Sequence, residues 1–165
     1  MTIKQSPLEL KDCALLNFNC KFVAPKSAAK DVNIFTEYFE KYSVDVNFAI
    51  TNASSDLPQV YVKSSINMDL DETKRLPGYE IYIECVGVFH INNEQITIED
   101  KMNLLTNSAV VMVLNFLRTQ TSAITASFIF GRYLLPSIDM KDLLEKKKAD
   151  LEKRKSEKQK VTSKK

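Results

Sequence analysis

Four stretches of the chain alternate between apolar and polar residues, which is the pattern of a β-strand with one buried face. The first runs from Leu8 to Ala24, and the others begin near Val44, Val60 and Tyr79. The side chains expected to face the core are Leu8, Leu10, Ala14, Leu16, Phe18, Cys20, Phe22, Val44, Val46, Phe48, Ile50, Val60, Val62, Ile66, Met68, Leu70, Tyr79, Ile81, Ile83, Cys85 and Phe89. Short to medium connections favour an antiparallel sheet with the other face in water.

The longest apolar stretch follows these strands and has helical spacing. One stripe consists of Val110, Val113, Leu114 and Leu117. Met112 and Phe116 cover a second face of the same helix. A helix that is apolar on two faces needs two partners, so we expect one face on the sheet and the other against a second subunit.

A second helix is predicted at the C-terminal end. Pro136 ends an extended piece, Ser137 or Asp139 can cap the helix, and the apolar stripe that starts at Met140 fades beyond Ala149. The predicted fold is therefore α+β: a four-stranded antiparallel sheet with a long apolar helix packed on one face and a second, C-terminal helix.

Aromatic residues recur at helical spacing between the first two strands. Phe35, Tyr38, Phe39 and Tyr42 stand at i, i+3, i+4 and i+7, which predicts a short helix or a lip over one edge of the sheet. These rings could fill the core of the chain, or they could form the aromatic wall of a binding groove.

Candidate chemistry is sparse. The one histidine, His90, stands at an outward strand position, so a multi-histidine metal site is not expected. Cys20 and Cys85 are expected to point inward and Cys13 outward, so the three thiols do not converge. No glycine-rich phosphate loop, nucleophile elbow or paired-carboxylate site stands out. We expect neither an enzyme nor a cofactor.

The chain is long enough for one domain, with 165 residues of which 44% are hydrophobic. Its start lacks an apolar signal core, and no run of apolar residues is long enough for a membrane span. An odd number of cysteines, three, fits a reducing compartment better than a disulfide framework. A cytoplasmic location is expected.

Charge is uneven along the chain. Residues 141–165 carry eleven basic and five acidic residues, so a mildly acidic body precedes a basic tail. We expect residues 1–148 to form the folded domain and residues 149–165 to lack stable structure. A solubilising role is the first interpretation of the tail, because no aromatic residue interleaves with its lysines. Binding to RNA, to an acidic partner or to anionic lipid is the alternative.

The order of elements and several short motifs resemble the SecB family of export chaperones. Leu114-Asn115-Phe116-Leu117-Arg118 is similar to the family's Phe-Pro-Tyr-x-Arg helix, and Leu134-Leu135-Pro136-Ser137-Ile138-Asp139 to its entry into the final helix. Weaker similarities lie at Lys21-Phe22-Val23-Ala24-Pro25 and at Gly87-Val88-Phe89. The resemblance spans about residues 8–146.

The resemblance implies a homotetrameric holdase that keeps precursor proteins unfolded for export through the Sec translocase without ATP. It places a client-binding groove at Phe35, Phe39, Phe128, Phe130, Tyr133, Leu134, Met140 and Leu143. It places the oligomer interface at Ile81, Ile83, Cys85, Val110, Met112, Val113, Phe116 and Leu117. The candidate face for docking the translocase motor ATPase is Glu80 and Glu84 on the fourth strand.

Some residues depart from the family pattern. Asn115 stands where many members have proline, and Asn19 and Val23 stand where the family has first-strand acidic residues toward the motor. The alternative function is a dedicated SecB-like chaperone of a single client such as an antitoxin, without motor docking. A scaffold that merely shares the fold is a third reading.

Overall fold

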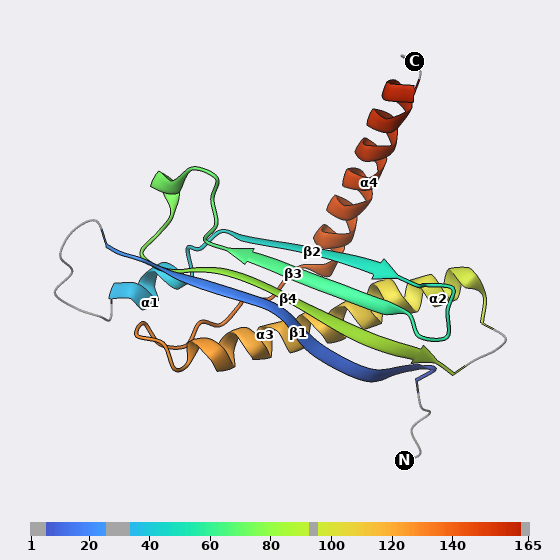
Figure 1. Cartoon of the computed structure of the whole chain (residues 1–165), viewed down its shortest axis with the longest axis horizontal. Helices are drawn as coiled ribbons and strands as arrows, with labels where there is room; N and C mark the ends of the chain where they lie inside the picture. Colours follow the sequence, from blue (N-terminus) through green and yellow to red (C-terminus); the bar gives the residue numbers. More distant parts are fainter. Residues whose placement is uncertain (1–5, 26–33, 93–95, 163–165) are drawn as a thin grey trace.

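One antiparallel sheet, with α-helices on one side, organises the chain. The structure, a computed structural model, describes residues 6–25, 34–92 and 96–162, with the side chains of 34–36 and 154–162 not described. The strands β1 (Leu8–Val23), β2 (Val44–Thr51), β3 (Gln59–Ile66) and β4 (Gly78–Ile91) lie in the order β1-β4-β3-β2 (Figure 1). The remaining elements are α1 (Ile34–Phe39), the 3-10 turn η1 (Glu72–Lys74), α2 (Ile98–Leu104), the π-helical turn η2 (Leu105–Ala109), α3 (Val110–Thr125) and α4 (Met140–Thr162). The predicted fold class is confirmed.

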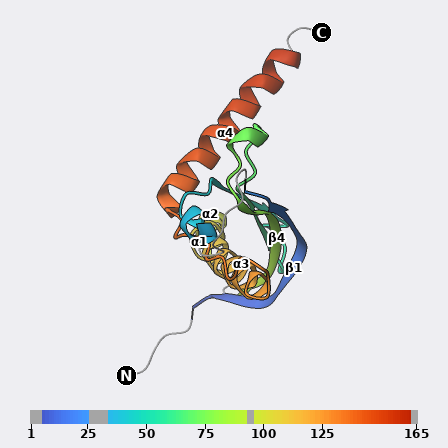
Figure 2. The same cartoon turned by 90° about the vertical axis from the view of Figure 1, so that its left-hand side faces the viewer.

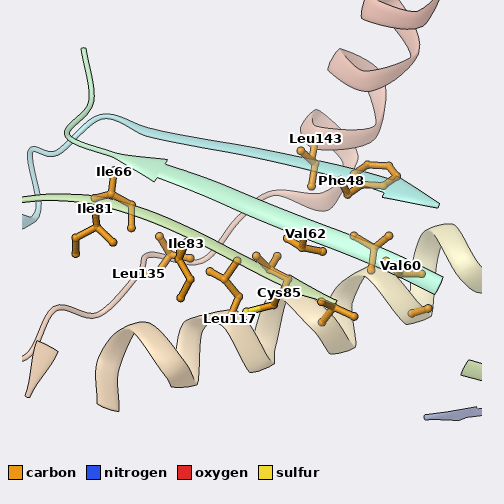
Figure 3. Packing of buried hydrophobic residues seen from close by; sticks show 14 of the residues in the cluster. Phe48, Val60, Val62, Ile66, Ile81, Ile83, Cys85, Leu117, Leu135 and Leu143 are labelled. Atoms are coloured by element: carbon orange, nitrogen blue, oxygen red, sulfur yellow. The ribbon is translucent and has the colours of Figure 1, made fainter. Parts of the chain in front are cut away.

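The core lies between the inner face of the sheet and α3, which together form two layers (Figure 2). Its fully buried side chains from β3 and β4 are Val60, Val62, Ile66, Tyr79, Ile81, Ile83, Cys85 and Phe89. Val110, Val113 and Leu117 of α3 face them, and Figure 3 shows Leu117 between the strands and the helix. The predicted alternation of β4 and the helical stripe of α3 thus produce this core directly.

The alternation of β1 is interrupted twice. The pairing with β4 shifts between Leu10 and Asp12 and again between Leu15 and Asn17, so Lys11 and Leu16 are extra residues. Each extra residue reverses which side chains face the core, and the second reversal cancels the first. Cys13 therefore faces inward, where it packs on the core, and the expectation that it points outward is wrong.

The third strand ends earlier than its alternation predicts. Asn67 follows β3 with a positive φ of 55°, and its amide holds the loop by donating to the carbonyls of Leu76 at 2.7 Å and Tyr79 at 2.8 Å. Met68 and Leu70 were expected to face the core, but they are 37% and 100% exposed. The apolar–polar alternation of the sequence continues past the end of β3, but there the Asn67 side chain holds the backbone in a loop.

Helix α4 is longer than the sequence analysis expected. It runs to Thr162, so residues 149–162 are helical rather than without regular structure. Only its first turns contact the body, where Leu143 lies beside Phe48 of β2 (Figure 3). Beyond them the helix projects away from the sheet (Figures 1 and 2). No helix in the described part of the chain has the length and apolar composition needed to cross a bilayer.

Gly87 sets how closely α3 approaches β4. A Cβ atom at Gly87 would lie 2.5 Å from Cγ2 of Val113 and 2.8 Å from the Phe89 ring. We expect Gly87→Ala to lower the free energy of unfolding by about 1 to 3 kcal/mol, because overpacking forces a packed helix to move. Urea denaturation measures this. Combining Gly87→Ala with Val113→Ala should recover part of the loss, and strictly additive effects would contradict the proposed contact.

Candidate functional site

Aromatic side chains from four parts of the chain meet at one end of the sheet. They come from β1, from α1 and the turn after it, from the start of β4, and from the crossover segment between α3 and α4 (residues 126–139). The aromatic cluster consists of Phe18, Phe22, Phe39, Tyr42, Tyr79, Phe128, Phe130 and Tyr133. Neighbouring ring centroids lie 5.4 to 6.4 Å apart, the range in which tilted and edge-to-face pairs are favourable.

Tyr79 is the centre of the aromatic cluster. Its ring stacks on Phe39 at 5.4 Å and lies 5.5 Å from Phe130. Its hydroxyl donates to the carbonyl of Gly131 at 2.8 Å and accepts from the backbone N–H of Phe130 at 3.0 Å. One buried side chain thus fixes the crossover segment, which has no regular secondary structure of its own, onto the sheet.

Tyr42 and Tyr133 lie in the same cluster, and their hydroxyls differ in hydrogen bonding. The Tyr42 hydroxyl donates to the carbonyl of Pro77 and accepts from the backbone N–H of Tyr79, both at 2.8 Å. Burial raises the pKa of Tyr42 to about 12 and also raises that of Tyr133. The Tyr133 hydroxyl is buried and has no hydrogen-bond partner among the described residues. Both phenols therefore stay protonated at neutral pH.

The aromatic cluster is open to solvent on one side. Phe22 is 57% exposed although its ring lies 5.8 Å from those of Tyr79, Phe128 and Phe130. Ile129, between two half-buried phenylalanines, is 71% exposed. Phe22 therefore presents a ring that the described residues leave largely uncovered, beside rings that are packed against one another. Exposed ring faces of this kind are suited to contact with apolar side chains.

The predicted groove residues fall in two places. Phe39, Phe128, Phe130 and Tyr133 meet in the aromatic cluster, although Tyr133 is only 1% exposed and belongs to the core. Leu143 instead packs with Phe48, and Met140 is half-buried at the start of α4. Leu134 is 68% exposed, although its neighbours Tyr133 and Leu135 are both buried. The Phe35 side chain lies outside the described residues.

The sequence analysis missed Phe22 and Ile129 as surface residues. Phe22 occupies an inward strand position, so its alternation predicted burial. The signal available in the sequence was its position next to the end of the strand, just before Pro25. Ile129 had no periodic signal, because the crossover segment is irregular.

Most of the predicted oligomer interface is the core of a single chain. Ile81, Ile83, Cys85, Val110, Val113 and Leu117 have no exposed surface, because they pack between the sheet and α3. They cannot contact another subunit, and their assignment to an interface is wrong. Met112, 38% exposed, and the half-buried Phe116 remain at the surface of α3.

The predicted motor-docking carboxylates differ from one another. Glu80 is 7% exposed and is neutralised by Arg75 at 2.8 Å and Lys21 at 3.7 Å. Glu84 is more accessible and accepts a hydrogen bond of 3.3 Å from the Tyr82 hydroxyl. Only Glu84 therefore offers a carboxylate that is free of a cation among the described ion pairs.

The cysteines have the properties of core residues. Burial raises the pKa of Cys85 to about 12 and that of Cys20 to about 11, and it also raises that of Cys13. All three stay as thiols at neutral pH. No group of three or more metal-ligating side chains occurs within the described part of the chain.

Comparison with known proteins places the fold. No protein-family model and no curated protein matches the sequence. Among solved structures, the chain is similar to the Mycobacterium tuberculosis SecB-like chaperone Rv1957, solved in complex with a ChAD peptide from the Rv1956 HigA1 antitoxin. That match has a TM-score of 0.53 and 14% identity over 80% of this chain and 91% of the other. A protein of unknown function from Streptococcus agalactiae matches with a TM-score of 0.39 and 10% identity, over 79% of this chain and 97% of that one. The fold is SecB-like.

The two buried hydroxyls provide a matched test of the aromatic cluster. Tyr79→Phe removes two hydrogen bonds and leaves a carbonyl and an N–H of the crossover segment unpaired, so we expect a loss of about 2 kcal/mol in stability. Tyr133→Phe removes a hydroxyl without a partner and should be neutral or stabilising by up to about 1 kcal/mol. Urea denaturation of both variants decides this, and equal losses would contradict the described geometry.

Proposed function

We propose that this chain is a non-catalytic, ATP-independent chaperone that binds apolar segments of unfolded client proteins. The observation that carries the proposal is the exposed ring of Phe22, which lies beside the packed rings of the aromatic cluster. Ile129, in the crossover segment next to two rings of the cluster in sequence, is exposed as well. Exposed apolar side chains of this size are typical of sites that bind other macromolecules. The SecB-like fold supports the same class of function.

Binding at this surface needs no chemical step. A client side chain that leaves water to lie on the ring faces contributes about 1.5 to 3 kcal/mol when fully buried. Several such side chains along one segment give useful affinity, yet each contact stays weak enough to exchange. Tyr79 holds the underlying rings in place, so the surface does not have to order itself when the client binds.

A dedicated client is the finer form of the proposal that the structure favours. The fold neighbour Rv1957 was solved with a peptide from an antitoxin. The export alternative calls for an acidic surface toward the translocase motor, and here Glu80 is paired with Arg75 and Lys21. We therefore place a small set of cytoplasmic clients, such as an antitoxin, ahead of general export. Pull-down from lysate with mass spectrometry separates one dominant client from many.

Assembly into an oligomer, with a tetramer as the proposed state, is supported by uncovered apolar side chains. Met112 is exposed on α3, and β1 is an edge strand that displays Leu10, Leu15 and Leu16 at 41%, 36% and 52% exposure. A long edge strand with exposed leucines normally pairs with, or is covered by, another chain. Oligomerisation would also multiply the aromatic clusters available to one client.

Substitution of exposed residues tests client binding without disturbing the core. Phe22→Ser combined with Ile129→Ser should abolish suppression of aggregation of an unfolded substrate, while the melting temperature falls by only a few degrees. Light scattering of the aggregating substrate measures activity, and calorimetry measures stability. The matched control is Leu70→Ser with Leu151→Ser, whose leucines are 100% and 48% exposed outside the aromatic cluster. Undiminished activity of the Phe22/Ile129 variant would remove this surface from the proposal.

A charge on α3 tests the assembly. Met112→Glu should convert the oligomer into an 18.8 kDa monomer with unchanged circular dichroism, because a carboxylate in a dry interface must be paired or neutralised. Multi-angle light scattering at micromolar concentration measures the mass. Leu70→Glu, at a fully exposed leucine, is the control and should leave the mass unchanged. Oligomers of Met112→Glu with wild-type mass would place the interface elsewhere.

A further inference from the structure

Most of helix α4 lies outside the body of the molecule. Only its first turns pack on β2, and the rest projects away from the sheet (Figures 1 and 2). From Glu145 to Thr162 its apolar residues are Ala149, Leu151 and Val161. Such a helix buries little apolar area when the chain folds, so the charges that cover it call for another explanation.

The charges of α4 are sorted by sign around the helix axis. Successive residues of an α-helix are turned by about 100° about the axis. The five acidic residues therefore fall on one side of the helix, at Asp142, Glu145, Asp150, Glu152 and Glu157. An arc of about 120° on the opposite side includes no acidic residue of α4. Its basic positions are Lys147, Lys148, Arg154, Lys155 and Lys158.

The first of these lysines belongs to the contact with the body. The Lys147 ammonium donates to Oδ1 of Asn47 at 2.7 Å and lies 5.4 Å from the ring centroid of Phe48. Lys148 is exposed, and the positions after it lie where the helix has left the sheet. The basic face, as we call it, extends over about 15 Å of helix and consists of Lys148, Arg154, Lys155 and Lys158.

A second copy of α4 does not fit the basic face. Leu144 and Leu151 stand one heptad apart, which is the spacing of a coiled-coil seam. The other positions of that seam include Lys147, Arg154 and Lys158. Two such helices, packed along this seam, would bring like charges together.

A nucleic-acid backbone fits the basic face better than a membrane does. A helix that lies in a membrane surface buries Leu, Phe or Trp side chains along one side. Residues 145–160 of α4 include one large apolar residue, Leu151. A nucleic-acid duplex presents one negative charge per about 1.7 Å of its axis, so phosphates can lie opposite the whole length of the basic face.

We propose that the basic face of α4 binds the phosphate backbone of RNA. The choice of RNA rests on the proposed function, because a chaperone of unfolded chains meets them during synthesis, on a ribosome whose surface is largely RNA. Contact with phosphates positions a protein without reading sequence. It would keep the aromatic cluster close to apolar segments as they emerge.

Fluorescence anisotropy with the full-length protein and a labelled RNA hairpin tests the proposal. Four phosphate contacts predict that the affinity falls about a hundredfold between about 50 and 200 mM salt. The test variant changes three lysines of the basic face to glutamine, which keeps helix propensity: Lys148→Gln, Lys155→Gln and Lys158→Gln. It should bind the hairpin at least about tenfold more weakly than wild type at the lower salt concentration, with a shallower salt dependence.

A matched control removes the same charge from the acidic side of the helix. It combines Lys146→Gln, Lys153→Gln and Lys160→Gln. This variant should bind RNA within about threefold of wild type, because its lysines stand among carboxylates rather than on the basic face. Circular dichroism checks that the two variants keep the same helix content.

The other outcomes overturn the proposal. Equal losses in the two variants would show that binding follows net charge alone, and RNA binding that neither variant weakens lies elsewhere on the chain. Tighter binding to a DNA duplex, to vesicles containing phosphatidylglycerol or to poly-glutamate than to RNA would overturn RNA as the partner. The basic-face variant should suppress aggregation of an unfolded substrate as wild type does. A wild type that fails to suppress aggregation contradicts the proposed function, whether or not it binds RNA.

Discussion

The buried side chain of Tyr79 connects β1, α1 and the crossover segment, which are not joined to one another by backbone hydrogen bonds of a helix or a sheet. Its ring contacts Phe22 of β1, Phe39 of α1 and two phenylalanines of the crossover segment. Its hydroxyl satisfies the backbone of Phe130 and Gly131. Backbone groups in an irregular segment must find partners when they approach a core, and here one phenol supplies them. The crossover segment is held further along by the buried side chains of Tyr133 and Leu135 and by the Thr125 hydroxyl, which accepts from the Tyr133 N–H at 2.9 Å.

This arrangement explains how one set of rings can belong to a core and also serve as the binding surface proposed here. Tyr79 and Tyr133 are buried, Phe128 and Phe130 are half-buried, and Phe22 and Ile129 lie at the surface. Stability depends on the inner members, while the outer members add little to folding and remain available to another chain. Burial decreases from the inner to the outer members of the cluster, so folding and the proposed client binding depend on different residues. The sequence alone suggested either a core role or a groove role for these rings.

The fold could be predicted because its signals are local. Alternation in β4 and helical spacing in α3 specify which faces meet, and both were predicted correctly. The faces of β1 could not be predicted, because the extra residues Lys11 and Leu16 change the register through pairing with β4 and leave no mark on the sequence pattern. The interface assignment was wrong for a related reason. Helical periodicity predicts that Val113 is buried, but it does not show whether the sheet of the same chain or a second subunit covers it. The site itself depends on contacts between Tyr79 and Phe130 and Gly131, which are about fifty residues further along the chain, so no local pattern in the sequence shows them.

The two bulges of β1 also limit how its free edge can be used. Continuous pairing with β4 is unbroken from Asn17 to Val23, whereas the part before it is divided at Lys11 and Leu16. Bulges twist a strand and displace its outward-facing N–H and C=O groups, so a foreign strand laid along the whole edge would lose register twice. A short partner strand can therefore pair with the seven regular residues of this edge. The long cross-β stacking that leads to aggregates is interrupted at the bulges. The regular pairing surface that this edge offers is therefore short.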